Sequence, residues 1–272
     1  MDLAIPEGSI TALVGPNGSG KSTLIRSWIG FEPPTEGRLV TGGVDPQRDR
    51  KGAVRRVGYV SQVPSLYREL TIAEHVELAI TLRPGFDPAV ARHYIERLAI
   101  PLDRQADELS GGEQAQVGLA LALGTRAKIL LLNEPLASLD PLARREFLHI
   151  LIEAVRADGS TALLSSHVIT DIEQACDRLV VLGRGRPLLD LSIGEAIAHH
   201  RVVEGPVTVA GDRVIGSFPA PTGERLTLVR WDGAATEGYS GREATLEEVV
   251  IGHLAHGRAS SVVPLVPTDE AA

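Results

Sequence analysis

Residues 15–22 read Gly15-Pro16-Asn17-Gly18-Ser19-Gly20-Lys21-Ser22, and Thr23 follows them. This run fits the phosphate-binding pattern G-x-x-x-x-G-K-[ST]. Its surroundings fit as well, because residues 9–14 are predicted to form a strand and residues 22–29 a helix whose apolar side chains share one face. An ordinary glycine turn before a helix would not account for Lys and Ser in this register.

The loop residues predict a nucleotide site. Glycines let successive backbone N–H groups turn toward phosphate oxygens, and the helix adds the positive end of its dipole. We therefore expect residues 15–23 to bind a nucleoside triphosphate, with Lys21 on the β- and γ-phosphates and the Ser22 hydroxyl on Mg²⁺.

Short apolar runs of strand length continue along the chain at residues 57–60, 129–132, 161–165 and 179–182. Helices alternate with them, most clearly one with Asp140 as N-cap, Pro141 at the first position and Gly159 at its end. This order predicts an α/β fold with a mostly parallel sheet flanked by helices. Leu3 and Ile5 alternate with polar or small neighbours, so a short antiparallel β portion is expected at the N-terminus.

The pattern of predicted secondary structure changes after about residue 190. Residues 201–210, 213–218 and 225–231 are predicted as strands, and a capping box at Thr245 opens a helix that Gly257 is expected to end. This predicts a nucleotide-binding domain at 1–190 with a helical lobe at about 64–112, a small α+β accessory domain at 191–262, and a flexible tail at 263–272.

Composition limits the function classes. The formal net charge of −8 argues against a nucleic-acid binder, since phosphate contacts need surplus Lys and Arg. The single cysteine, Cys176, is expected to pack against a helix rather than react. No signal peptide is apparent, and no apolar run approaches the ~20 residues of a spanning helix.

A second glycine motif reads Leu109-Ser110-Gly111-Gly112-Glu113 before a predicted helix. Ser-Gly-Gly presents a hydroxyl and bare N–H groups, which makes a second phosphate-binding surface. Two copies of the chain could close a nucleotide between the loop of one and the Ser-Gly-Gly of the other. At this point the sequence strongly resembles the ABC ATPase family, whose signature usually reads Leu-Ser-Gly-Gly-Gln.

The resemblance covers about residues 2–190 and assigns roles to further residues. Gln62 is similar to the glutamine that touches Mg²⁺ and the attacking water, and Asn133 stands at the metal-side position with Glu134 as the catalytic base. Asp140 ends the loop that starts at Ala137, and the resemblance implies that Asp140 contacts the nucleotide. His167 resembles the switch histidine that contacts the γ-phosphate. Alone, Gln62 would be a surface residue and His167 a structural one.

Three departures from the family pattern stand out. The family has Asp where this chain has Asn133, which implies weaker Mg²⁺ binding and slower turnover, or a substituted residue. No aromatic residue precedes Trp28, which itself follows the glycine-rich loop, although the family stacks one on adenine from an earlier strand. Glu113 replaces Gln and places a carboxylate near the nucleotide across the dimer.

Other polar pairs have plainer interpretations. His253 and His256 have a spacing that a metal could use, but without a further ligand in register a solvated helix is favoured. His199 and His200 are expected at the surface, and Arg144 and Arg145 on a solvated helix face.

The resemblance implies an ATP-hydrolysing subunit that powers an ABC transporter, with ATP and Mg²⁺ as ligands. Its expected partners are itself or a paralogous cassette in a head-to-tail dimer, and a separate membrane permease seated near residues 62–82, with Leu66, Tyr67 and Leu70 as contacts. The chain would lie in the cytoplasm on the inner face of the membrane. The C-terminal strands and helix resemble the tails of bacterial export-type cassettes, so export is expected.

Two alternatives remain at this stage. A non-transport ABC ATPase, acting on the ribosome or in DNA repair, usually carries two cassettes, a basic linker or long coiled coils, and the sequence shows none of them. A nucleotide-binding regulator with little catalysis is supported by Asn133 and the missing aromatic residue.

Overall fold

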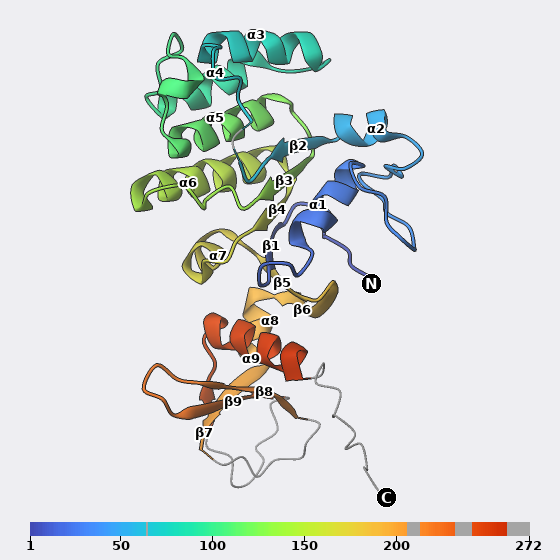
Figure 1. Ribbon diagram of the computed structural model, residues 1–272, viewed down its shortest axis with the longest axis vertical. Helices are drawn as coiled ribbons and strands as arrows, with labels where there is room; N and C mark the ends of the chain where they lie inside the picture. Colours follow the sequence, from blue (N-terminus) through green and yellow to red (C-terminus); the bar gives the residue numbers. More distant parts are fainter. Residues whose placement is uncertain (64, 206–212, 232–240, 260–272) are drawn as a thin grey trace, which may run out of the picture.

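The computed structural model describes residues 1–63, 65–205, 213–231 and 241–259, and a six-stranded sheet lies at its centre (Figure 1). The strand order is β2-β3-β4-β1-β5-β6, in which the first five strands are parallel and β6 is antiparallel to β5. The strands are β1 Ile10–Val14, β2 Val57–Val60, β3 Ile129–Asn133, β4 Thr161–Ser165, β5 Arg178–Gly183 and β6 Arg186–Ser192. The predicted mostly parallel sheet is therefore confirmed.

Helices cover both faces of this sheet, as predicted. α1 (Lys21–Ile29) packs on one face against Leu131 and Leu163, whereas α5 (Gly111–Gly124) and α6 (Pro141–Asp158) pack on the other against Leu130, Leu132 and Leu164. The alternation of side chains along β3 and β4 thus divides one apolar run between two cores. α2 (Arg50–Arg55) lies beside α1, and α7 (Ile169–Ala175) follows β4.

A helical lobe lies at one end of the molecule (Figure 1). It contains α3 (Ile72–Leu82), α4 (Pro88–Arg97) and the 3₁₀ helix η1 (Ala106–Glu108), which pack with the middle of α5 through an apolar cluster of their own. Arg83 at the end of α3 donates to the carbonyls of Val54, Arg55 and Val57, so its side chain ties the lobe to the end of α2 and the start of β2.

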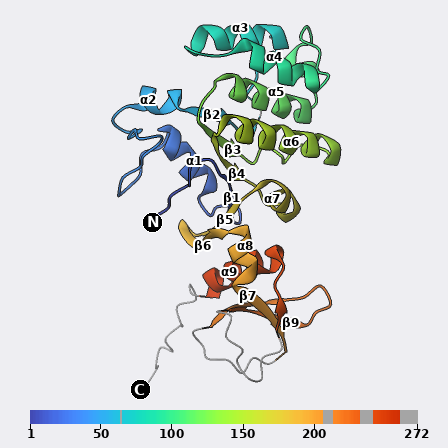
Figure 2. The same ribbon diagram turned by 180° about the vertical axis from the view of Figure 1, so that it is seen from behind.

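A four-stranded antiparallel sheet of order β10-β7-β9-β8 lies at the opposite end (Figure 2). Its strands are β7 His200–Glu204, β8 Val214–Pro219, β9 Arg225–Arg230 and β10 Arg242–Glu243. Two helices belong to the same part of the chain, α8 Ile193–Ala198 and α9 Leu246–Ala259. Its core is continuous with that of the first sheet, because Val14 and Val181 share a cluster with Leu228 and Val249. Part of the predicted strand 201–210, and the predicted tail 263–272, lie outside the described residues.

Two local predictions are wrong. α9 does not end at Gly257 but continues to Ala259. A Cβ at Gly257 would lie 2.9 Å from Leu188 Cδ1, so this glycine permits close packing rather than ending the helix. Residues 1–9 form no strand, and the expected N-terminal antiparallel portion is reduced to one bridge between Thr41 and Val44. Gly42 and Gly43 take positive φ there, as the two central residues of a tight hairpin turn do, but no further described residues on either side of this turn pair as strands.

The predicted surface placement of His200 and His253 is also wrong. Both are buried, and their Nε2 atoms lie 3.1 Å apart between β7 and α9. His200 Nδ1 lies 2.6 Å from the Ala196 carbonyl and donates to it, so its Nε2 accepts from His253. Burial lowers the pKa of both rings, that of His253 to about 4, with Arg230 nearby adding to the effect. The two histidines thus form a neutral, hydrogen-bonded core pair.

Cys176 packs between the two apolar clusters on either side of α7, as predicted. Burial raises the pKa of its thiol to about 12, so it is a poor nucleophile. In the part of the chain that the structure describes, no helix combines the length and apolar character needed to cross a membrane.

Candidate nucleotide-binding and hydrolysis site

The glycine-rich loop lies between the end of β1 and the start of α1, as the sequence predicts. Gly18 and Gly20 have φ of 78° and 102°, which side-chain-bearing residues rarely adopt. A Cβ at Gly15 would lie 2.3 Å from the Leu182 carbonyl oxygen, so only glycine fits against β5. No side chain caps the N-terminus of α1, which leaves its first N–H groups directed into the loop. This cradle suits an anion such as a phosphate.

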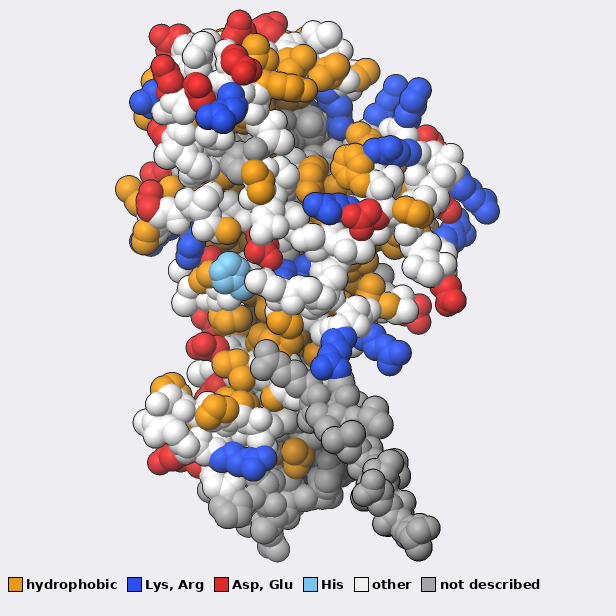
Figure 3. Space-filling view, in the orientation of Figure 1, with side chains coloured by type: hydrophobic (Ala, Val, Ile, Leu, Met, Phe, Trp, Pro, Cys, Tyr) orange, Lys and Arg blue, Asp and Glu red, His pale blue; other side chains and the backbone are white. Residues whose placement is uncertain are grey.

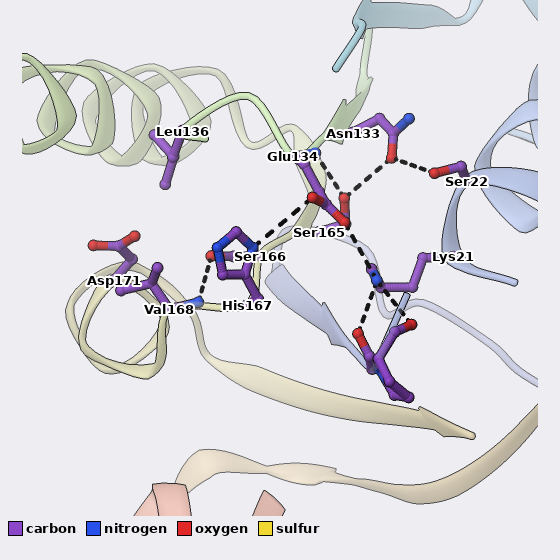
Figure 4. A network of polar contacts seen from close by, with 12 residues as sticks. Lys21, Ser22, Asn133, Glu134, Leu136, Ser165, Ser166, His167, Val168 and Asp171 are labelled. Atoms are coloured by element: carbon purple, nitrogen blue, oxygen red, sulfur yellow. Dashed lines mark hydrogen bonds and ion pairs between the residues drawn. The ribbon is translucent and has the colours of Figure 1, made fainter. Parts of the chain in front are cut away.

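Lys21 and Glu134 meet beside the loop (Figure 4). The buried Lys21 ammonium donates to the Gly15 carbonyl at 2.8 Å and lies 3.3 Å from Glu134 Oε1. Glu134 directly follows β3 and has a φ of 48°, and its backbone N–H donates to Ser165 Oγ at 2.7 Å. A left-handed backbone at a residue other than glycine is strained, and such strain gathers at functional sites. The hydroxyl of Ser165 holds this strained residue in place.

Ser22, Asn133 and Ser165 form a second group next to it. Ser22 Oγ donates to Asn133 Oδ1 at 3.1 Å, and Ser165 Oγ lies 3.3 Å from the same amide oxygen. Both hydroxyls thus face the oxygen of Asn133, not its nitrogen. Hard oxygen donors of this kind are what Mg²⁺ prefers, usually together with substrate phosphates. The donor set therefore fits Mg²⁺, with one negative charge fewer than an aspartate would supply.

The remaining predicted catalytic residues lie at the edge of this group. The exposed His167 follows β4, and its Nδ1 is 3.8 Å from Glu134 Oε2. Gln62 follows β2 and is exposed, and no described contact joins it to Lys21 or Asn133. All of these residues follow the carboxyl ends of parallel strands, which meet at one edge of the sheet.

The Ser-Gly-Gly motif lies elsewhere in the chain. Ser110 caps α5, and Glu113 returns to its backbone N–H at 2.8 Å, forming a capping box. These hydrogen bonds from Ser110 lower the pKa of the Glu113 carboxyl, and Arg104 adds to this at 3.5 Å. A Cβ at Gly111 would lie 3.6 Å from Ser138, so the motif packs on the loop after Glu134. The two phosphate-binding surfaces do not meet within the described contacts of a single chain.

Asp140 acts as the N-cap of α6, accepting from the N–H groups of Leu142 and Ala143 at 2.9 and 3.0 Å. The described contacts do not bring it to the glycine-rich loop. Arg144, expected on a solvated face, instead turns inward, and its Nη2 donates to the Leu136 carbonyl at 3.4 Å. Ser165 is a site residue that was not predicted, although a polar residue at the end of an apolar strand was a usable signal in the sequence.

The fold and this edge of the sheet define a P-loop nucleotide-binding protein. The model of the ABC transporter family matches residues 1–137, half of the 272 residues. Among curated proteins, the sulfate/thiosulfate import ATP-binding protein CysA of Mesorhizobium japonicum is 33% identical over 89% of this chain and 78% of its own length. Methionine import ATP-binding protein MetN 1 of Burkholderia orbicola is 32% identical over 85% of this chain and 70% of its own length. The phosphonates import ATP-binding protein PhnC of Chromohalobacter salexigens is 33% identical over 82% and 88%.

Solved structures agree. An ATP-binding subunit of an ABC transporter has a TM-score of 0.63 and 30% identity over 72% of this chain and 83% of its own. A dimeric ATP-binding cassette in a post-hydrolysis state bound to ADP and Pi has a TM-score of 0.64 and 26% identity over 70% and 88%. The chain belongs to the ABC transporter family, as an ATP-binding subunit. The expected export direction is not confirmed, since the curated relatives reported above carry import names.

Proposed function

We propose that this chain hydrolyses ATP, with Glu134 as the general base. The observation that carries the proposal is the convergence of Lys21, Glu134 and Asn133 beside the glycine cradle. Lys21 supplies positive charge where the β- and γ-phosphates would lie, and it already lies 3.3 Å from the Glu134 carboxylate. Glu134 would take the proton of the attacking water, and His167 would bind the γ-phosphate.

Mg²⁺, when bound, would neutralise phosphate charge. Ser22 and Asn133 are the residues placed to hold it, since Ser22 Oγ and Asn133 Oδ1 are only 3.1 Å apart. Gln62 would join them by a movement of the exposed segment after β2. The role of this chain is to fix these two oxygens. Ser165 holds one of them by donating to Asn133 Oδ1, and it also accepts from the backbone N–H of Glu134.

We expect Asn133→Asp to lower the Mg²⁺ concentration needed for hydrolysis and to raise the rate. A carboxylate adds a negative charge where the amide has only a dipole. A charge-assisted contact is worth about 1.5–3 kcal/mol, so the effect should be roughly tenfold or larger. Steady-state ATPase titrated with Mg²⁺ measures it, and in a Glu134→Gln background the rate gain should disappear. An unchanged or slower Asn133→Asp protein would favour the regulator interpretation.

We further propose that two copies, or this chain and a paralogue, bind ATP head to tail. Within one chain Ser110 caps α5, the next residue, Gly111, packs on Ser138, and no described hydrogen bond joins Ser110 to Lys21. A partner's Ser110 is then the available second phosphate surface for each glycine-rich loop. The capping box holds the Ser110 hydroxyl and the α5 N-terminus ready for that contact.

A membrane permease is proposed to dock on the helical lobe. Exposed apolar side chains gather there over α3, where Figure 3 shows a hydrophobic patch. Tyr67 and Leu82 are 59% and 69% exposed. The segment that presents Tyr67 is held rigidly, because the buried His75 accepts from the Tyr67 N–H at 2.8 Å while its other ring nitrogen contacts the Thr71 carbonyl. Exposed apolar groups on a rigid frame are typical of an interface. The predicted contacts Leu66 and Leu70 are half-buried beside it.

We expect Tyr67→Glu and Leu82→Glu to release the chain from membranes of cells that contain its permease, by roughly tenfold or more for a buried interface anchor. The basal ATPase of the purified chain should stay unchanged, because neither residue contacts the nucleotide site. Val40→Glu, at a position 49% exposed outside the lobe, is the matched control and should leave membrane association intact. Unchanged membrane association of both variants would exclude this surface as the docking site.

The direction of transport is proposed to be import, not the export that was expected from the C-terminal strands and helix. This rests on the curated relatives, which are 32–33% identical and carry import names. The chain would then work in the cytoplasm, at the inner face of the membrane.

We also propose to divide the chain into a nucleotide-binding domain that ends at residue 190 and an accessory domain that begins at residue 191. The helical lobe at about 64–112 extends into α5, because Val117 and Ala120 of this helix belong to the apolar cluster of the lobe.

A further inference from the structure

Arg144 and Asp171 face each other behind the proposed catalytic residues. Arg144 lies in the first turn of α6 and Asp171 in the first turn of α7, and their Nε and Oδ2 atoms are 3.8 Å apart. The Asp171 side chain is 7% exposed and that of Arg144 27%. Both of these atoms are buried without a hydrogen-bond partner among the described residues. The pair is therefore an ion pair that is too long for a hydrogen bond.

Each member of the pair is connected to one proposed catalytic residue. Arg144 Nη2 donates to the carbonyl of Leu136, two residues after Glu134. Asp171 lies one helical turn after His167, on the helix that this histidine precedes. Arg144, Glu134 and His167 also line one small pocket. Burial raises the pKa of Asp171, while the positive charge of Arg144 opposes this shift.

The two buried charges of this pair are farther apart than is favourable. A buried carboxylate and guanidinium lose hydration, and only short, well-aligned hydrogen bonds compensate for this loss. At 3.8 Å the compensation is incomplete, so the pair gains energy by shortening. Shortening draws the start of α7, and His167 with it, toward the loop that carries Glu134, whose carboxylate is 3.8 Å from His167.

We propose that Arg144 and Asp171 are positioning residues that set the separation of Glu134 and His167 during hydrolysis. The inference depends on the proposed role of Glu134 as the base. The pair couples the loop after β3 to the helix after β4 and acts through the separation of Glu134 and His167, so we expect its effect on kcat to exceed its effect on KM. Neither residue contacts the glycine-rich loop in the described structure.

Steady-state ATPase kinetics test this. Asp171→Asn and Arg144→Gln are each expected to lower kcat about tenfold while KM for ATP changes less than about twofold, since a charge-assisted contact of 1.5–3 kcal/mol is lost from the hydrolytic step alone. The double variant should be no slower than the slower single variant, because the two residues act as one unit. Asp171→Glu keeps the charge on a longer arm and should retain kcat within about threefold of the original protein.

Arg126→Gln is the matched control, since Arg126 pairs with Asp158 at the far end of α6 at 2.9 Å, and its kcat should not change. Additive losses in the double variant, an unchanged kcat in Asp171→Asn, or an equal loss in Arg126→Gln would each overturn the inference. Thermal unfolding of every variant identifies a loss of folding, and Asp171→Glu decides the question if Asp171→Asn does not fold. A Glu134→Gln protein that still hydrolyses ATP would instead refute the proposed function.

Discussion

Glu134→Gln is expected to lower the rate of ATP hydrolysis by roughly 10²–10⁴-fold, the usual contribution of a general base. Glutamine keeps the shape of the side chain but cannot accept a proton from water. The strained backbone of residue 134 and its hydrogen bond to Ser165 Oγ should persist, because they involve only main-chain atoms of this residue. Nucleotide affinity should therefore remain within about threefold. Phosphate release under saturating ATP and Mg²⁺ measures the rate, and titration with a fluorescent nucleotide measures the affinity.

Glu173→Gln is the control for this change. Glu173 is an exposed carboxylate on α7 that does not belong to the group of Lys21, Asn133 and Glu134 beside the glycine-rich loop. Its hydrolysis rate should match that of the unchanged chain. A Glu134→Gln protein that keeps its hydrolysis rate within about threefold would mean that another group takes the proton, and the assignment of the base would be withdrawn.

Lys21→Ala is expected to weaken nucleotide binding on the order of 100-fold, whereas Ser110→Arg leaves binding nearly unchanged and stops turnover. Lys21 makes charge-assisted contacts to phosphates from within its own chain, and two such contacts at about 1.5–3 kcal/mol each account for this loss. Ser110 caps α5 and has no described contact with the glycine-rich loop, so its substitution leaves the loop of its own chain intact. An arginine there would block only a contact made to a partner.

Ser192→Arg is the matched control for Ser110→Arg. Ser192 has the same capping-box arrangement with Glu195 at the start of α8, so the local cost of losing the cap is similar. Turnover in Ser192→Arg should stay near that of the unchanged chain. Loss of ATP binding in Ser110→Arg as large as in Lys21→Ala would show that Ser110 does not act on a partner's nucleotide.

Local signals in the sequence were sufficient wherever one element determines its own structure. The glycine-rich loop, the Asp140 cap with Gly159 at the other end of α6, and the Thr245 capping box all occur as predicted, because each depends on neighbours within a few residues. The apolar strands were predicted for the same reason, since their length and composition reflect burial on both faces.

What the sequence could not predict depends on contacts between distant elements. His200 and His253 are 53 residues apart, and nothing in either segment shows that a partner satisfies the buried ring. Arg144 was expected in solvent because only the fold brings Asp171 to it. The site residues after β1, β3 and β4 could be named, but the contacts that fix Asn133 and Glu134 through Ser165 come from the order of strands in the sheet.

The claim that two chains close head to tail around ATP is tested most directly by sedimentation of Glu134→Gln with and without ATP and Mg²⁺. Hydrolysis is removed in this variant while both phosphate-binding surfaces remain. We expect a mass of 29.0 kDa without nucleotide and twice that mass with ATP, and a return to 29.0 kDa when Ser110→Arg is added. A mass of 29.0 kDa at saturating ATP, or a dimer that Ser110→Arg does not disrupt, would contradict it.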